Sequence, residues 1–175
     1  MAITRQHTKQ MPANNHELGA PIICPPETVL AEWIDYNGHL NMAFYNVIFD
    51  HAVDHLYDYL GIGQAYTKRG IGSCFTMEVH VHYLAELSLD DEVEVHMQGL
   101  DFDSKRVHLF EQLYHKGDGY LAATSEQIGM HIDMGTRRSA PFPESVVEEL
   151  QRLHEAHKTL TVPEQVGHVI GIKKK

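Results

Sequence analysis

The chain has 175 residues, of which 43% are hydrophobic, and its formal net charge at pH 7 is -10. This length and apolar share fit one globular domain with an ordinary core, and they exclude disorder throughout. The negative charge argues against a nucleic-acid surface, and no apolar run reaches the ~18 residues of a membrane span.

The N-terminal stretch of the chain is polar, and the segment after Thr159 has no clear pattern. Residues 1–20 lack the apolar centre of a signal peptide and are expected to form a flexible leader. Cys24 and Cys74 lie far apart and in no CxxC pair, so without an export signal we expect buried thiols in a reducing cytoplasm rather than a disulfide. Residues 21–158 are predicted to form a single domain and residues 159–175 a C-terminal tail whose last three lysines are solvated.

The first predicted elements are a strand, a turn and a helix start. Prolines occur within residues 21–26, and the extended run over residues 29–33 predicts an edge-like strand that starts after them. Asn37 and Gly38 are a turn signal, and Asn41 suits the N-cap of a helix.

A long helix is predicted from Met42 to Leu60, because apolar residues recur there at three- and four-residue steps. Gly61 supplies a natural C-cap. The polar residues form one narrow line at i, i+4 spacing, namely Asn46, Asp50, Asp54 and Asp58. A helix with so wide an apolar face should be wrapped by other structure on most sides.

The pattern changes to period two after a short helical turn at residues 64–69. Four long strands are predicted over residues 77–83, 92–97, 107–115 and 120–133, with a hairpin turn at residues 116–119 and a last helix from Glu144 to His157. Long strands joined by short turns imply an antiparallel sheet. The expected fold class is α+β, with a curved sheet around the long helix, its only large apolar partner.

Asp35 is the leading candidate for catalysis, because it stands just before the turn into this helix. A carboxylate can act as base or nucleophile on an activated carbonyl, and exposed helix N–H groups can hold the resulting oxyanion. The alternative is that Asp35 only caps the turn. The pattern favours a small acyl-transfer enzyme, above all a thioester hydrolase.

The element order and the segment Asp35-Tyr36-Asn37-Gly38-His39-Leu40-Asn41 followed by Tyr45 resemble the hotdog-fold acyl-CoA thioesterases of the 4-hydroxybenzoyl-CoA thioesterase type. The resemblance covers about residues 25–145. In that family an Asp, a Gly three positions on and a Tyr ten positions on open the central helix, as Asp35, Gly38 and Tyr45 do here. Residues 132–143 resemble the family's common ending of the last strand.

Within the family, residues 33–39, 105–110 and 122–127 resemble the betainyl-CoA thioesterases of carnitine breakdown. The resemblance implies hydrolysis of a small acyl-CoA thioester, with coenzyme A as part of the substrate and no other cofactor. It also implies a homodimer or a dimer of dimers in which two sheets join edge to edge. The active site then lies between a loop and helix start of one chain and strands of the other.

The resemblance makes Asp35 the nucleophile or general base and the backbone N–H of Met42 the oxyanion donor. Asn37 could orient Asp35 or form only an Asx turn. His39 could tune the carboxylate, contact substrate, carry a proton or be structural. Glu78, on the polar face of its strand, could hold or activate water or be an ordinary strand residue.

A quaternary ammonium substrate would need aromatic faces. The candidates for substrate binding are Trp33, Tyr36, Phe44 and Tyr45, any of which could be plain packing, together with Asn41, whose main role is the helix cap. The phosphates of coenzyme A would need cations at the entry. The candidates at strand ends are Lys105, Arg106, Arg137 and Arg138, each of which could be an ordinary surface charge.

The 14 histidines raise the question of a metal. His51 and His55 are spaced i, i+4 on the long helix, and His80 and His82 share a strand face; both spacings could ligate zinc. Neither pair has an obvious third ligand in the sequence, and HExxH is absent, so no metal is expected.

The sequence is also compatible with other functions. An enoyl-CoA hydratase or dehydratase of the same fold carries a different Asp/His motif. A non-catalytic acyl-CoA-binding regulator would be expected to carry a DNA-binding appendage. A hydrolase of another short-chain or aromatic acyl-CoA is the nearest alternative to the betainyl-CoA enzyme.

Overall fold

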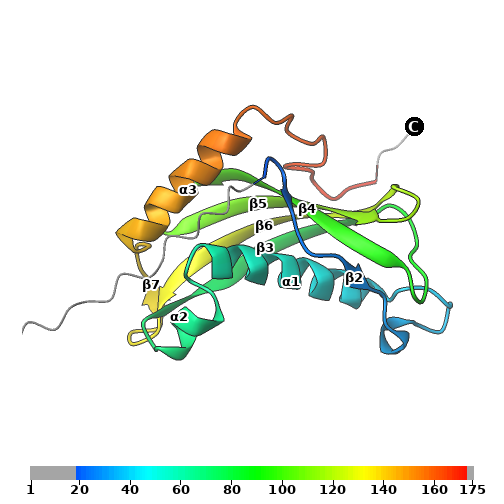
Figure 1. Cartoon of the computed structure of the whole chain (residues 1–175), viewed down its shortest axis with the longest axis horizontal. Helices are drawn as coiled ribbons and strands as arrows, with labels where there is room; N and C mark the ends of the chain where they lie inside the picture. Colours follow the sequence, from blue (N-terminus) through cyan, green and yellow to red (C-terminus); the bar gives the residue numbers. More distant parts are fainter. Residues whose placement is uncertain (1–18, 173–175) are drawn as a thin grey trace, which may run out of the picture.

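The structure is a computed structural model that describes residues 19–172 (Figure 1). Its elements are β1 (Ile22–Ile23), β2 (Glu27–Thr28), a 3-10 helix (Ala31–Trp33), α1 (Met42–Tyr59), α2 (Gln64–Lys68), β3 (Gly72–Tyr83), β4 (Glu92–Phe102), β5 (Arg106–His115), β6 (Leu121–Asp133), β7 (Arg138–Ser139) and α3 (Glu144–His157). No helix in this range is long and apolar enough to cross a membrane. The predicted flexible leader, apart from residues 19 and 20, and the three terminal lysines lie outside the described residues.

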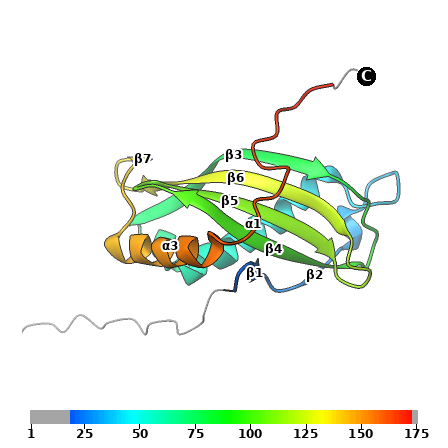
Figure 2. The same ribbon diagram turned by 90° about the horizontal axis from the view of Figure 1, so that it is seen from above.

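The strands form one antiparallel sheet with the order β1-β4-β5-β6-β3, in which β2 also pairs with β4 and β7 with β6 (Figure 2). The four predicted long strands and the curved antiparallel sheet are therefore confirmed. β3 is a long edge strand, and it leaves large apolar side chains between 37% and 56% exposed, namely Phe75, Met77, Val79 and Tyr83. A long edge strand with exposed apolar side chains is prone to pair with a strand of another chain.

Helix α1 lies against one face of the sheet, as the pattern predicts. The Asn41 side chain caps it by accepting a hydrogen bond from the Ala43 N–H at 2.9 Å, and Gly61, at φ +74°, follows its last turn. The helix buries Tyr45, Ile48, Phe49, Ala52, Val53, Leu56 and Tyr57. The helix and the sheet approach so closely that a Cβ atom at Gly129 of β6 would overlap the Tyr57 hydroxyl.

Helix α3 is a second large apolar partner of the sheet, so the prediction that α1 is the only one is wrong. Its buried residues Val146, Leu150 and Leu153 join the same core. His157 fastens the helix to β4, because its Nδ1 accepts the Gly99 N–H at 2.9 Å. Burial lowers the pKa of His157, which keeps the ring neutral.

The predicted edge strand over residues 29–33 is also wrong. Pairing with β4 occurs instead in two short pieces, β1 before Pro25 and Pro26 and β2 directly after them. Prolines cannot donate to a ladder, so they divide the strand. Residues 31–33 then form a 3-10 helix that turns Trp33 into the core.

The inner face of the sheet carries a buried polar cluster beneath α1. Glu111 of β5 is fully buried and accepts a hydrogen bond from the Gln127 amide at 2.5 Å. Burial raises the pKa of Glu111 to about 8, and the Gln127 amide opposes the rise. The Glu111 carboxyl is thus neutral in the folded protein over most of the physiological pH range.

Candidate active site

A tight turn before α1 presents Asp35. Ile34 and Leu40 form an isolated antiparallel bridge at the base of the turn. Within the turn, the Gly38 N–H donates to the Asp35 carbonyl at 3.0 Å. Gly38 has φ +87°, a conformation that a residue without a Cβ adopts most easily. The Asn37 main-chain N–H donates to Asp35 Oδ1 at 2.7 Å, and its side-chain amide lies 3.4 Å from Oδ2. The Asp35 side chain is therefore the acceptor of an Asx turn, and Asn37 holds its carboxylate as the donor.

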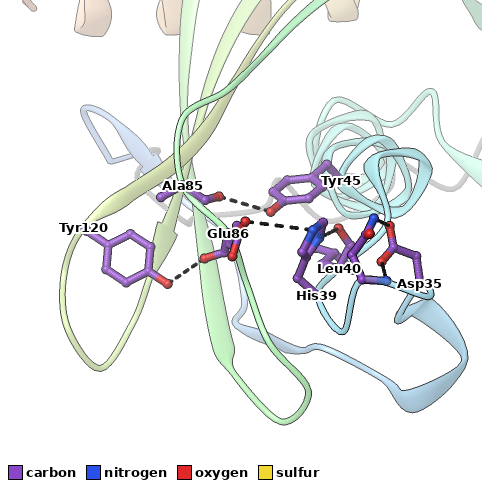
Figure 3. A network of polar contacts seen from close by, with 8 residues as sticks. Asp35, His39, Leu40, Tyr45, Ala85, Glu86 and Tyr120 are labelled. Carbon is purple, nitrogen blue, oxygen red and sulfur yellow. Dashed lines mark hydrogen bonds and ion pairs between the residues drawn. The ribbon is translucent and has the colours of Figure 1, made fainter.

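Asp35 borders a cleft of about 400 Å³. The residues that line the cleft are Asp35, His39, Leu40, Met42, Tyr45, Tyr83, Leu84, Ala85 and Glu86. Figure 3 shows the two walls, with Asp35 and His39 on the side of α1 and with Ala85 and Glu86 across from them. The carboxylate and the helix start thus share one hollow.

The start of α1 offers the cleft one free backbone donor. The Ala43 N–H is taken by the Asn41 side chain and the Phe44 N–H by the Asn41 carbonyl. Within residues 19–172 no group accepts the Met42 N–H, and Met42 lines the cleft. A helix N-terminus carries a partial positive charge, so this donor is suited to an oxyanion.

Two tyrosines and an acid complete the cleft, Tyr45 from α1 and Tyr83 and Glu86 from the side across from it. The rings of Tyr45 and Tyr83 meet edge to face with centroids 5.2 Å apart. The Tyr45 hydroxyl donates to the Ala85 carbonyl at 3.2 Å, and burial raises its pKa to about 12, so it stays protonated. The Glu86 carboxylate lies 3.9 Å from His39 Nε2.

Sequence reasoning missed Tyr83, Leu84 and Glu86 as cleft residues. Tyr83 ends a strand on the same face as Val79 and Val81, which pack toward α1. The period-two pattern could therefore have assigned Tyr83 to the helix side of the sheet. No local signal marks Leu84 or Glu86, which lie in the segment after the strand.

The other aromatic candidates lie elsewhere. Trp33 is buried and stacks on Phe44, with ring centroids 5.6 Å apart and an interplanar angle of 16°, so this pair packs the core. Tyr36 is 97% exposed at the tip of the turn. None of the three lines the Asp35 cleft, and Asn41 acts there as the helix cap.

Glu78 does not meet Asp35 within one chain. It lines a second hollow of about 500 Å³, on a different part of the sheet, together with Arg106 and His108. Arg106 is engaged there by Asp103, whose Oδ2 accepts from the guanidinium at 2.6 and 2.8 Å.

The four cationic candidates gather at one end of the sheet, away from Asp35. Lys105 and Arg106 lie at the β4–β5 turn and Arg137 and Arg138 at the β6–β7 turn. The two turns are neighbours, because the His131 N–H donates to the Lys105 carbonyl at 2.8 Å. This is the end at which β3 begins, whereas the Asp35 cleft lies where β3 ends.

The fold and this cleft define a hotdog-type thioesterase. A profile of the thioesterase-like superfamily matches residues 29–150, and the chain belongs to this family. The match confirms the predicted family and the predicted class, a thioester hydrolase.

Individual relatives agree with this assignment. The chain is 43% identical to the betainyl-CoA thioesterase of Pseudomonas aeruginosa, over 82% of this chain and 91% of that protein. It is 31% identical to the L-carnitine dehydrogenase/betainyl-CoA thioesterase of Rhizobium meliloti, over 93% of this chain and 33% of that longer protein. A Staphylococcus aureus protein whose structure is a complex with CoA superimposes with a TM-score of 0.82 at 38% identity, over 91% of this chain and 99% of that one.

Proposed function

We propose that this protein hydrolyses betainyl-CoA to glycine betaine and CoA. The observation that carries the proposal is the single cleft that joins the Asp35 carboxylate and the free Met42 N–H to the rings of Tyr45 and Tyr83. The relatives that are named for this activity support the choice of acyl group.

The chemistry needs one carboxylate and one donor. In one route Asp35 takes a proton from water while the water oxygen attacks the thioester carbonyl, and the C–S bond then breaks to release CoA. In the other route Asp35 attacks the carbonyl itself, and water cleaves the resulting anhydride. In both, the Met42 N–H stabilises the oxyanion, by about 3 kcal/mol for one such donor. After a single turnover in ¹⁸O-labelled water, label in the Asp35 carboxylate identifies the second route with water attack on the Asp35 carbonyl of the anhydride, because the first route places the label only in the product.

The acyl group of betainyl-CoA carries a trimethylammonium, which cannot donate a conventional N–H hydrogen bond. Aromatic faces attract such a cation by about 0.5–2 kcal/mol each. The corner formed by Tyr45 and Tyr83 supplies two rings, and the carboxylates of Asp35 and Glu86 add negative charge to the same hollow.

Recognition of the trimethylammonium by aromatic rings predicts that the enzyme selects its acyl group by charge rather than by shape. The neutral isostere 3,3-dimethylbutanoyl-CoA has carbon in place of the ammonium nitrogen. We expect Tyr83→Leu to lower the ratio of kcat/KM for betainyl-CoA over the isostere by about 2- to 30-fold, the range of one cation–π contact. Tyr83→Phe keeps the ring and should leave the ratio within about twofold of the parent. A parent enzyme that cleaves both thioesters equally well would refute charge recognition.

We also propose that the enzyme works as a homodimer joined along β3, alone or within a dimer of dimers. Pairing two β3 edges antiparallel, by two-fold symmetry, would cover the exposed apolar residues of this strand. It would also bring the cationic end of one chain beside the Asp35 cleft of the other. Arg137 and Arg138 would then be available to the phosphates of CoA bound at the partner's Asp35.

A complementation experiment tests this arrangement. Arg137→Gln/Arg138→Gln should raise KM by about 10- to 100-fold if charge-assisted hydrogen bonds to phosphate are lost. When this variant is refolded together with Asp35→Asn, mixed dimers carry one intact site, and about a quarter of the parental sites should return. Activity that stays at the sum of the two separate variants would contradict a shared site. Sedimentation supplies the mass of the assembly.

A further inference from the structure

A histidine cluster lies outside the active site, on the face of the sheet opposite α1. His80 and His82 alternate along β3 with Val79 and Val81, which pack toward α1. The C-terminal segment, red in Figure 1, crosses the sheet on this far side. There the Gly167 N–H donates to Glu126 Oε2 at 2.7 Å, and His168 comes to lie beside the two strand histidines.

The three rings are arranged as a ligand set. One imidazole nitrogen from each of His80, His82 and His168 lies within 4.8 Å of the other two. The ring centroids are 4.8 Å apart for His80 and His82, and 4.5 Å apart for His82 and His168. Among the hydrogen bonds of residues 19–172, none uses a ring nitrogen of these three histidines. Their nitrogen lone pairs are thus not committed to other groups there.

We propose that His80, His82 and His168 bind one divalent transition-metal ion, with zinc as the ion of choice, and that the ion fastens the C-terminal segment to β3. Neutral imidazole suits zinc and its neighbours in the first transition row. Zinc–nitrogen bonds of about 2.0–2.1 Å hold the ligand nitrogens about 3.3 Å apart, so the rings must close inward by small side-chain rotations. His168 is exposed and has room to do so. A water molecule would complete four-coordination.

The surroundings favour a cation. Glu126 pairs in register with His80 on the neighbouring strand, and its carboxylate is held by His108 Nε2 at 2.8 Å and by the Gly167 N–H. It places negative charge beside the cluster and at the same time anchors the residue before His168. None of the three histidines lines the Asp35 cleft of the same chain, so the cluster is a separate site within the chain. The sequence shows no obvious third ligand for the His80 and His82 pair, and the fold places His168 beside them.

Calorimetric titration of the full chain with Zn²⁺, prepared without a polyhistidine tag and freed of metal by a chelator, tests the site. We expect one ion per chain, and Co²⁺ in its place should show the intense visible bands of tetrahedral coordination. His168→Gln should weaken Zn²⁺ binding by more than about 100-fold, beyond the effect of losing a supporting contact. His55→Gln, which removes a histidine of the other spaced pair, is the matched control and should bind as the parent does.

A second measurement tests whether the ion holds the C-terminal segment against β3. Zn²⁺ should slow protease cleavage within residues 159–172 of the parent and leave the cleavage of His168→Gln unchanged. Because His168 is exposed, its replacement leaves the core intact. Absence of stoichiometric Zn²⁺ binding, or equal affinity in His168→Gln, would overturn the proposal. Betainyl-CoA hydrolysis is a separate readout that bears only on the catalytic proposal.

Discussion

Asp35→Asn is expected to lower kcat for betainyl-CoA by about 100- to 10,000-fold, the usual contribution of a positioned base, and more if Asp35 is the nucleophile. The amide has the shape of the carboxylate and keeps an oxygen that can accept the Asn37 N–H. It can neither take a proton from water nor attack the thioester. Release of the CoA thiol, followed with a chromogenic thiol reagent, measures the loss.

Two controls keep this result specific to the chemistry. Glu32→Gln removes an exposed acid three residues earlier, in the 3-10 helix, which does not line the cleft, and should retain parental turnover. The thermal unfolding midpoint of Asp35→Asn should stay within a few degrees of the parent, since the turn is preserved. If Asp35→Asn turned over betainyl-CoA within a few-fold of the parent rate, another group would have to be the base or nucleophile.

Glu111→Gln is expected to stabilise the protein at neutral pH. The buried carboxyl has its pKa raised from 4.5 to about 8, so the folded chain holds a proton that the unfolded chain releases above pH 4.5. The free energy of unfolding therefore falls as pH rises from about 4.5 to about 8. Above about pH 8 the ionisation of Glu111 changes it no further. Between pH 5 and pH 7.5 the parent should lose about 3 kcal/mol of unfolding free energy relative to Glu111→Gln, as an order of magnitude.

Urea unfolding at the two pH values measures this difference. The glutamine can still accept from the Gln127 amide, so the variant isolates ionisation from packing. Glu92→Gln, an exposed acid on the neighbouring strand β4, should leave the pH dependence of the parent unchanged. Parallel stability curves for the parent and Glu111→Gln would show that the carboxyl is not held neutral by the fold.

Local patterns in the chain were enough for the helix, the long strands and the catalytic candidate. The 3.6-residue recurrence of apolar side chains located α1, and Asn41 and Gly61 marked its ends, because capping depends on a few neighbouring residues. The alternation in β3 to β6 likewise reflects a period that each strand carries by itself. The spacing of Asp35, Gly38 and Tyr45 pointed to the family for the same reason.

The tertiary structure alone decided which distant residues meet. Strand register and loop direction bring Tyr83 and Glu86 opposite Asp35, carry Arg137 and Arg138 to the far end of β3, and lay His168 over His80 and His82. Periodicity cannot reveal such pairings, since it reports the face on which a side chain lies and not the partner across from it. The raised pKa of Glu111 also depends on tertiary structure, because its carboxyl is neutral only when the helix that covers it removes it from water.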